Sequence, residues 1–348
     1  MEKPLWSDVH VQVHRGLRMR SLLPPGAAVV VAVSGGQDSI TLLRLLLDLQ
    51  PKWHWRLQVV HGDHRWRPDS ADNAAFVQDL CQGWGIPCRV VTAGDIPATE
   101  AAARQWRYQV FETIAQEGGY THVATGHTAT DRAETLLYNL IRGSGADGLQ
   151  ALAWQRPLGE DLPQMTVVRP LLDLTRQDTA DFCQRFALPI WPDPTNQEVT
   201  YARNRLRLAV MPYLREHFNP RVETALAHTA ELLMADVACL DALAQALYAT
   251  AVQFPTEHAS WQLHRPSLRT APLALQRRVV RQVLGQVMTA EVGFSHIEKL
   301  VALIDAPNRT QTDPFPGGLV AVVAADWILL QPLAADLGHG AAVGPGSP

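Results

Sequence analysis

The sequence of 348 residues contains only four cysteines, Cys81, Cys88, Cys183 and Cys239. No two of them are spaced as Cys-x-x-Cys, the arrangement typical of zinc sites, iron–sulfur clusters and redox motifs. A small secreted protein held by disulfides would carry a denser cysteine framework. The cysteines are therefore expected to be small core residues, and a zinc site, a cluster and a disulfide scaffold are all disfavoured.

Long apolar runs are also missing. No run reaches the length of a membrane span, and the first ten residues lack the basic-then-apolar order of a signal peptide. The composition, 47% hydrophobic and 18% charged, is that of a globular protein long enough for two domains. These features predict a cytoplasmic protein with no membrane partner.

An excess of positive charge is absent as well, because the formal net charge is −4. Binding to nucleic acid needs only a local basic face, however. Residues 203–215 hold four arginines and no acid, and residues 265–281 hold five arginines and no acid. Each stretch is either a solvated helix face or a phosphate-contacting surface, and its composition alone does not decide between the two.

A glycine-containing loop near the N-terminus has no lysine. It follows a valine-rich run at residues 28–33, typical of a buried strand, and it leads into a leucine-rich helix from Ile40. Paired glycines and a helix N-terminus present backbone N–H groups to an anion, so the loop is predicted to seat phosphate rather than to be only a capped turn. Without a lysine it is not a Walker A loop. The loop reads Ser34-Gly35-Gly36-Gln37-Asp38-Ser39.

Strand-like and helix-like segments alternate through the first 200 residues, which predicts a doubly wound parallel sheet. After residue 216 the sequence becomes alanine- and leucine-rich, which predicts long helices, and it ends with an expected β-hairpin at residues 317–330. We therefore expect a catalytic domain over residues 1–216, a mainly helical domain over residues 217–333 and a disordered tail over residues 334–348. Strands are expected at residues 28–33, 55–60, 87–92, 121–125 and 167–172, and long helices at residues 222–252 and 268–288.

Polar side chains follow the ends of the predicted strands, where ligands collect in open α/β sheets. His61 and His64 follow the second strand, and no third ligand of suitable spacing follows them, so nucleotide contact is favoured over zinc. His127 follows a later strand. Asp131 and Glu134 then project from one side of a helix, where they either complement the helix dipole or hold a metal or a substrate ammonium group.

Taken in order, these motifs resemble those of tRNA(Ile)-lysidine synthetases, within the PP-loop ATP pyrophosphatases. The resemblance is strong over residues 28–216 and weak beyond. The phosphate loop alone indicates only the superfamily, whereas the block Arg203-Asn204-Arg205-Leu206-Arg207 together with the loop at residues 193–196 narrows the resemblance to this family. The further matching segments are residues 61–67, Gly126-His127 with Asp131 and Glu134, residues 140–145, residues 169–171 and Asp193-Pro194-Thr195-Asn196.

The resemblance implies a ligase that uses ATP and Mg²⁺. Its substrates would be L-lysine and the isoleucine tRNA with a CAU anticodon, and lysine would join C2 of the wobble cytidine through an adenylated intermediate. AMP and pyrophosphate would leave, and codon specificity would change from AUG to AUA. A homodimer is a possible assembly.

The resemblance also assigns residues to roles. Asp38 matches a metal-associated position, Asp131 a functional acid and Arg205 a functional arginine. The loop residues Ser34 to Ser39 with His61 and His127 are expected to bind ATP. Substrate contacts are expected from Arg104, Asp131, Glu134, Arg203, Arg205 and Arg207.

One segment departs from the family pattern. Where the family usually reads Ala-His-His-x-Asp-Asp-Gln, this chain has Gly126-His127-Thr128-Ala129-Thr130-Asp131-Arg132. One histidine and one aspartate are lost and a cation is gained. A role for a paired aspartate is therefore not expected here.

Three other functions share some of these features. A 2-thiolating PP-loop enzyme shares the loop and the adenylation step but is expected to need paired cysteines. A NAD or GMP synthetase shares the loop but does not need an arginine-rich second half. A catalytically inactive tRNA-binding module would keep the basic stretches without needing Asp38 or Asp131.

Overall fold

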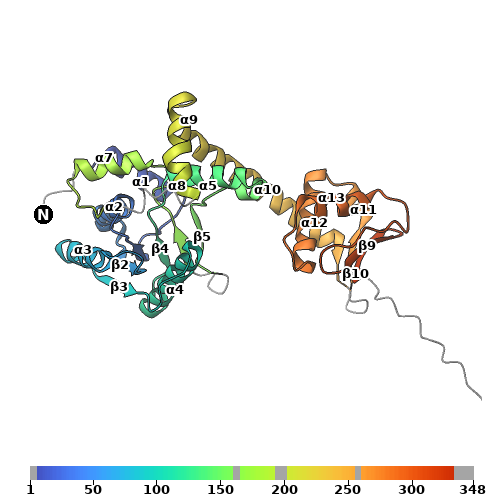
Figure 1. Cartoon of the computed structure of the whole chain (residues 1–348), viewed down its shortest axis with the longest axis horizontal. Coiled ribbons are helices and arrows are strands. Elements are labelled where there is room, and N and C mark those ends of the chain that lie inside the picture. Colours follow the sequence, from blue (N-terminus) through green and yellow to red (C-terminus); the bar gives the residue numbers. More distant parts are fainter. Residues whose placement is uncertain (1–5, 160–164, 193–201, 255–259, 333–348) are drawn as a thin grey trace, which may run out of the picture. The chain divides into compact units, whose positions relative to one another are not determined.

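The computed structural model describes residues 6–159, 165–192, 202–254 and 260–332. The expected loop at residues 193–196 and the expected tail at residues 334–348 lie outside these ranges. The chain divides into two compact units, Met1–Met234 and Ala235–Pro348. The division lies inside a long helix, whereas the expected boundary at residue 216 stands before that helix (Figure 1).

Unit 1 is built on a six-stranded sheet with the order β3-β2-β1-β4-β6-β5. All neighbouring pairs are parallel except β5 with β6, which is antiparallel. The predicted doubly wound parallel sheet is therefore confirmed, with one short antiparallel edge strand added. The strands are β1 (Ala28–Ala32), β2 (Arg56–Asp63), β3 (Cys88–Thr92), β4 (His122–Ala124), β5 (Gln155–Pro157) and β6 (Thr166–Val168).

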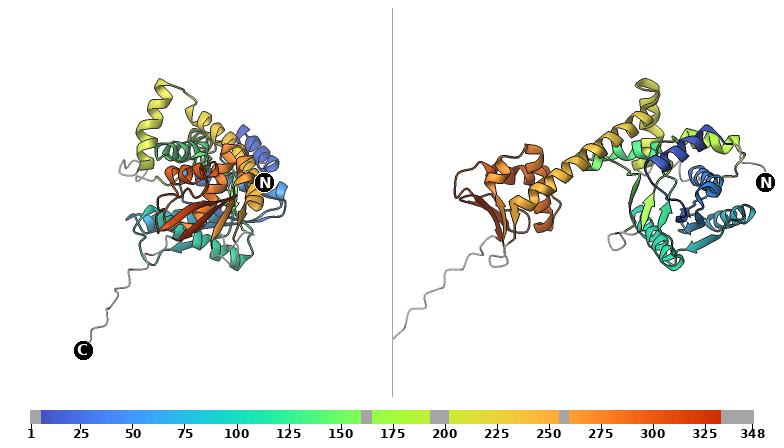
Figure 2. Two further views of the ribbon diagram at one scale, coloured as in Figure 1. Left: turned by 90° about the vertical axis from the view of Figure 1, so that its right-hand side faces the viewer. Right: turned by 180° about the vertical axis from the view of Figure 1, so that it is seen from behind.

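The valines of β1 explain why both faces of this sheet are covered. Val29 and Val31 pack into one core with α1, α2, α3 and α7, while Val30 packs into a second core with α4 on the opposite face. Alternate side chains of a strand point to opposite faces, so a continuous apolar run needs helices on both (Figures 1 and 2). These helices are α1 (Asp8–Met19), α2 (Gln37–Trp53), α3 (Ser70–Gly83), α4 (Glu100–Gly118) and α7 (Arg176–Arg185).

A third, smaller core joins three helices of unit 1 through Ala133, Met211 and Val222. Ala133 lies on α5 (Ala129–Ile141), which follows β4 and leads to the short α6 (Ala146–Leu149). Met211 begins α9 (Met211–His217), which continues from α8 (Ala202–Arg205) through a π-helical turn, η2 (Leu206–Val210). Val222 begins α10 (Val222–Ala251).

Helix α10 is long and apolar enough to cross a membrane by length and composition, the one such helix in the described ranges. Its polar side chains nevertheless make contacts within unit 1. Glu223 pairs with Arg215, and Glu231 accepts a hydrogen bond from Arg132 at 2.7 Å. The helix is thus tied to the catalytic unit by ion pairs as well as by Val222.

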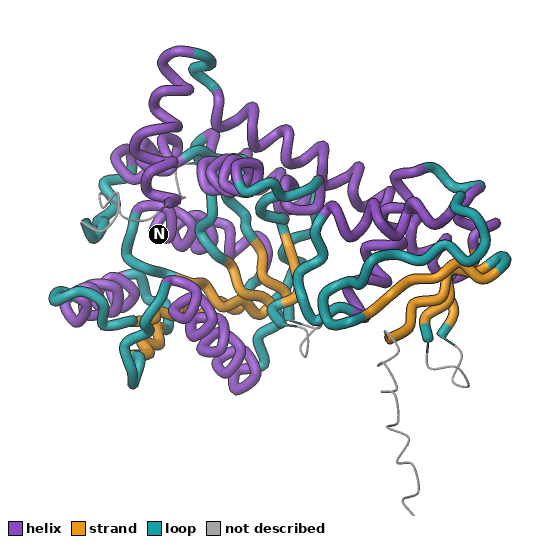
Figure 3. The backbone as a smooth tube through the Cα atoms, turned by 45° about the vertical axis from the view of Figure 1, so that its right-hand side comes forward, coloured by secondary structure: helices purple, strands orange, loops and turns teal. Residues whose placement is uncertain are grey.

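Unit 2 contains a four-stranded antiparallel sheet with the order β7-β8-β10-β9 (Figure 3). The predicted hairpin is confirmed as β9 and β10, but β7 and β8 extend it into a sheet. The predicted helix over residues 268–288 is wrong as one element, because Pro272 separates it into two. The elements are β7 (Val252–Gln253), β8 (Trp261–His264), α11 (Arg265–Arg269), α12 (Leu273–Val287), α13 (Phe294–Val301), η3 (Ala302–Ile304), β9 (Leu319–Ala324) and β10 (Trp327–Pro332).

Arg265 has a structural role in unit 2. Its guanidinium is buried and donates to the backbone carbonyls of Ile304 at 3.0 Å, Ala325 at 2.8 Å and Ala306. These bonds join the start of α11 to η3 and to the β9–β10 turn. Of the two interpretations considered for the arginines of residues 265–281, a solvated helix face and phosphate contact, neither fits Arg265.

Replacing this guanidinium should loosen unit 2. Arg265→Met removes the side-chain donor of the Ala306 and Ala325 carbonyls, while Ile304 keeps its bond from Arg269, and each unsatisfied buried group costs roughly 1–3 kcal/mol. We expect the amides of β9 and β10 to exchange hydrogen at least about 100-fold faster in the full chain, measured by mass spectrometry. Arg269→Met, which removes an exposed ion pair with Asp305 and one of the two donors to the Ile304 carbonyl, should change exchange much less, because it leaves no carbonyl without a donor. Equal exchange in the two variants would contradict the structural role.

Candidate functional site

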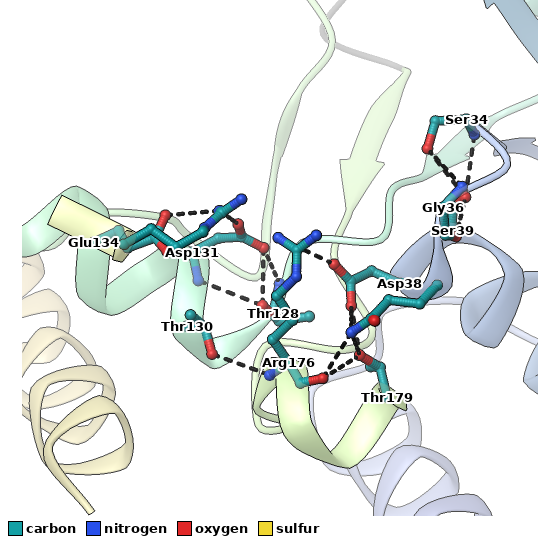
Figure 4. A network of polar contacts seen from close by, with 12 residues as sticks. Ser34, Gly36, Asp38, Ser39, Thr128, Thr130, Asp131, Glu134, Arg176 and Thr179 are labelled. Carbon is teal, nitrogen blue, oxygen red and sulfur yellow. Dashed lines mark hydrogen bonds and ion pairs between the residues drawn. The ribbon is translucent and has the colours of Figure 1, made fainter. Parts of the chain in front are cut away.

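The phosphate loop lies between β1 and α2, as predicted, and its hydroxyl groups brace it from inside. Ser39 Oγ donates to the Gly36 carbonyl at 2.9 Å and accepts from the Ser34 N–H at 3.1 Å. Gly36 is the N-cap of α2, so the first N–H groups of the helix and its positive dipole end face outward from the loop. The loop is therefore a preformed seat for an anion (Figure 4).

Two glycines make this loop geometry possible. Gly35 has φ +92°, and a Cβ there would lie 2.5 Å from Asn73 Oδ1. Gly126, after β4, packs directly on the loop backbone, since a Cβ there would lie 3.0 Å from the Asp38 carbonyl. Trp191, from the segment after α7, also contacts the loop. Its backbone N–H donates to the Gly35 carbonyl at 2.9 Å.

Asp38 points from the first turn of α2 toward α7 (Figure 4). Its Oδ1 accepts a hydrogen bond from Thr179 Oγ1 at 2.5 Å, and its Oδ2 lies 3.9 Å from Arg176. Burial raises the pKa of Asp38, and the charge of Arg176 and the Thr179 bond only partly oppose this. The carboxylate is thus held in one orientation beside the phosphate loop.

Asp38 fits the requirements of a magnesium site. Among the residues that the structure describes, no three His, Cys, Asp or Glu side chains are grouped to hold a metal ion. Mg²⁺ in a nucleotide site commonly needs only one or two carboxylates, because phosphate oxygens and water complete its coordination. Oδ2 of Asp38, beyond hydrogen-bond distance of Arg176, is the oxygen available for this.

The two predicted nucleotide-binding histidines have different surroundings. His61, on β2, is buried, and its Nδ1 donates to the Val33 carbonyl at 2.8 Å, which braces β2 against β1 under the loop. Burial lowers its pKa. His127 contacts Thr125 Oγ1 through Nδ1 at 2.9 Å, and burial lowers its pKa to about 4. Both imidazoles are therefore neutral near pH 7.

Asp131 and Glu134 lie on one side of α5, as the spacing predicts, and Arg207 of η2 binds both. Arg207 Nε donates to Glu134 Oε1 at 2.7 Å, and its Nη2 donates to Glu134 Oε2 at 2.8 Å and to Asp131 Oδ1 at 3.1 Å. Burial raises the pKa of Glu134, and Arg207 opposes this only in part. Burial would raise the pKa of Asp131 too, but His127, Arg207 and Thr128 outweigh it and lower that pKa.

The residues that depart from the family pattern have structural roles. Thr128 is the N-cap of α5 and forms a capping box with Asp131, whose Oδ2 accepts from the Thr128 N–H at 2.8 Å. Thr130 Oγ1 donates to Glu223 on α10 and accepts from the Arg176 N–H at 3.0 Å. Arg132, 1% exposed, bonds Glu231 on α10. The substituted positions thus tie α5 to α7 and α10.

Arginines surround Tyr108 on α4. The guanidinium carbons of Arg156 and Arg104 lie 4.7 Å and 5.6 Å from the centre of the Tyr108 ring. Burial would raise the pKa of Tyr108, but Arg156, Arg104 and Arg169 outweigh it and lower that pKa. The charges of Arg169 and Arg104 also lower the pKa of His127. Because Asp131 acts on the same imidazole, the positive charge of these arginines is felt close to Asp131.

The structure therefore brings together most of the predicted site residues and adds others. Arg207 meets Asp131 and Glu134, whereas Arg205 is exposed and Arg203 is half-buried on α8. Sequence reasoning missed Arg176 and Thr179, which hold Asp38. It also gave no role to Trp191 and Asn73, which contact Gly35. These residues carry no motif of their own, and only the packing of α7 and α3 against the loop identifies them.

Known proteins share both parts of this chain. A PP-loop domain family matches residues 11–214, and a TilS substrate binding domain family matches residues 263–324. The tRNA(Ile)-lysidine synthase of Nostoc sp. (strain PCC 7120) is 53% identical over 337 residues, covering 94% of this chain and 98% of the relative. The synthase of that name from Thermosynechococcus vestitus is 50% identical, with 94% of each chain covered.

A solved structure shares the fold at low sequence identity. The U34-tRNA thiolase NcsA from Methanococcus maripaludis, solved with its 4Fe-4S cluster, superposes with a TM-score of 0.54 at 17% identity. The match covers 65% of this chain and 78% of that one. It supports the α/β fold described above.

The two loop glycines should respond differently to a methyl group. Gly35→Ala forces a side chain into a left-handed backbone conformation, at a cost of about 1–2 kcal/mol, and against Asn73. Gly36→Ala, where φ is −75° and the nearest atom is 3.7 Å away, should leave stability almost unchanged. Thermal unfolding without nucleotide measures both. Equal melting temperatures would show that the loop adapts to a side chain at Gly35.

His127 should not titrate near neutrality. Because burial lowers its pKa from 6.5 to about 4, its NMR resonances should stay constant between pH 8 and pH 5. By linkage, the stability that neutral His127 contributes is complete above pH 6.5 and is lost as the pH falls toward 4. His127→Gln should flatten that part of the stability curve, measured by urea unfolding. A titration midpoint near 6.5 would contradict the buried environment.

Proposed function

Because this chain belongs to the tRNA(Ile)-lysidine synthase family, we propose that it joins L-lysine to C2 of the wobble cytidine of an isoleucine tRNA, using ATP. The site supports this function because two kinds of charge are separated in it. The phosphate loop and Asp38 suit a nucleotide with its magnesium, while Asp131 and Glu134 suit a cationic amino acid. The latter pair is the observation that carries the proposal, since nucleotide transfer alone does not need it.

The first half-reaction is adenylation of the cytidine O2. The O2 attacks the α-phosphate of ATP, and the bond from the α-phosphate to the pyrophosphate breaks. The loop from Ser34 to Ser39 would hold the departing phosphates through its backbone N–H groups, and Mg²⁺ at Asp38 would supply neutralisation of their charge. Negative charge gathers on the α-phosphate during this step. We assign its stabilisation to the exposed Arg205 and to the arginines near Tyr108, which include Arg104.

The second half-reaction is attack of the lysine ε-amino group on C2 of the activated cytidine, which expels AMP. Two carboxylates and one guanidinium leave one net negative charge at Asp131, Glu134 and Arg207. That balance suits a single ammonium group. Asp131, whose pKa is lowered, stays ionised, and we assign it to attracting the ammonium. Glu134 beside it, whose pKa burial raises, is the stronger base for the proton that the ammonium loses before attack.

The second unit is proposed to hold the tRNA. Arg277 forms an ion pair with Glu298, and Arg278 forms one with Asp241. A tRNA phosphate that binds either arginine would replace the carboxylate as its partner. Arg281, exposed on α12, and Arg203 on α8 are further candidates for phosphate contact. The cytoplasm and a homodimer remain our proposals for location and assembly.

The thiolase alternative is not favoured. That enzyme class is expected to use paired cysteines. Cys81 and Cys88 share a hydrogen bond between α3 and β3, Cys183 Sγ donates to the Gln37 carbonyl at 3.6 Å, and Cys239 is exposed on α10, so only Cys183 contacts the phosphate loop and it has no second cysteine beside it there. The expectation that all four cysteines lie in the core is wrong for Cys239.

Purified protein should release pyrophosphate when ATP and the CAU isoleucine tRNA are present, and it should form lysidine only when lysine is added as well. Arg205→Ala should slow formation of adenylated tRNA by about 100-fold, because a lost transition-state contact costs about 3 kcal/mol. Asp131→Asn should instead accumulate adenylated tRNA with lysine unjoined. Labelled ATP and gel separation of the tRNA measure both steps.

The reverse outcome would change the assignment. If Asp131→Asn fails to adenylate while Arg205→Ala adenylates normally, Asp131 belongs with the nucleotide. A structural control is needed for Asp131, because its Oδ2 also caps α5. The thermal unfolding of Asp131→Asn should therefore be measured as well. This separates a variant that has lost its folded structure from one that is folded but has lost one step of the reaction.

A further inference from the structure

The helical run from α8 through η2 to α9 has two different faces. Its buried face carries Leu206 and Met211, which are 6% and 1% exposed. Met211 packs with Ala133 and Val222 and so fixes α9 to α5 and α10. From this same run Arg207 reaches Asp131 and Glu134.

The outer face carries aromatic rings in solvent. Tyr213 is 57% exposed and Phe218 is 72% exposed. The Tyr213 ring centre lies 4.5 Å from that of His217 and 6.0 Å from that of Phe218, so the three rings form one cluster. Val210, Tyr213 and His217 are three and four residues apart, which puts them on one helix face.

The charge around this cluster is positive on balance. Arg215, whose side chain is 51% exposed, pairs with Glu223. Arg205 and Arg221 are exposed, while Glu216 beside His217 is an exposed acid. Flat rings beside arginines suit unpaired nucleotides, because bases stack on aromatic planes while arginines contact the backbone.

The cluster also lies at a suitable distance from the reacting groups. At 1.5 Å per residue, the six residues from Arg207 to Tyr213 span about 9 Å along the helix. A base taken out of its stack for chemistry leaves its neighbours without a stacking partner. A ring surface on the same rigid helix can replace that partner.

We propose that Tyr213, His217 and Phe218 form a stacking platform for unpaired bases of the anticodon loop, beside the cytidine that is modified. The proposal rests on the proposed function, since it takes tRNA as the substrate. It adds a base contact made by α9, separate from the phosphate contacts of arginines.

The test uses an anticodon stem-loop RNA with the CAU sequence and the full chain. The double variant Tyr213→Ala/Phe218→Ala should bind this RNA about 10- to 100-fold more weakly, since each lost stacked base has an effect of that size. The slope of log affinity against log salt should stay that of the wild type, because aromatic rings release no counterions. Tyr213→Trp should keep wild-type affinity.

The matched control is Leu232→Ala, which removes an apolar side chain 69% exposed on α10 and should leave RNA affinity unchanged. Wild-type RNA affinity in the double variant would overturn the platform. So would a change from dimer to monomer in sedimentation with RNA affinity retained, which would make the rings a contact between copies of the chain. If the wild type itself binds no RNA, it is the proposed function that has failed.

Discussion

The guanidinium of Arg207 between Asp131 and Glu134 is the interaction on which the catalytic unit depends. A buried and a half-buried carboxylate on one side of a helix repel each other, and this repulsion would favour protonation of one of them without a cation beside them. Arg207 lets Asp131 remain ionised and holds Glu134 by two hydrogen bonds. The guanidinium is not supplied by the sheet; it comes from a helix that is more than seventy residues later in the chain.

That dependence explains why the region around α5 contains so many further ties. Thr128 caps the helix with the same aspartate that Arg207 binds. Thr130 and Arg132 connect α5 to α10, and Met211 packs η2 and α9 onto it. Residues that depart from the family's usual pattern are among these ties, so they position the site although they are not at its centre.

Much of the fold was predictable because it follows from strong local patterns. The valine run of β1 needs cover on both faces, and strand and helix alternate in the way that parallel sheets require. The phosphate loop was predictable for the same reason, since Gly35 and Gly36 directly follow a buried strand. The strands that were missed, β5, β7 and β8, have two to four residues and no alternation to reveal them.

The contacts within the site were less predictable, because they depend on packing between distant segments. The sequence places arginines at 203, 205 and 207, and nothing in their spacing says which one reaches the carboxylates. Arg205 was assigned the functional role by resemblance, and Arg207 is the arginine that the structure places on Asp131 and Glu134. Thr179 likewise reaches Asp38 only because α7 packs beside α2.

The π-helical turn η2 has a consequence for how this segment can change in length. It carries Arg207, which faces inward, and continues into α9, whose rings face outward, so its winding sets the angle between them. Removing one residue there would rotate α9 by about 100° relative to α8. Met211 would then leave its core, and the rings would turn away from the side they now face. The exposed Leu208, Ala209 and Val210 could therefore be substituted without changing this angle, but an insertion or a deletion in residues 206–210 would separate the two faces of the helix.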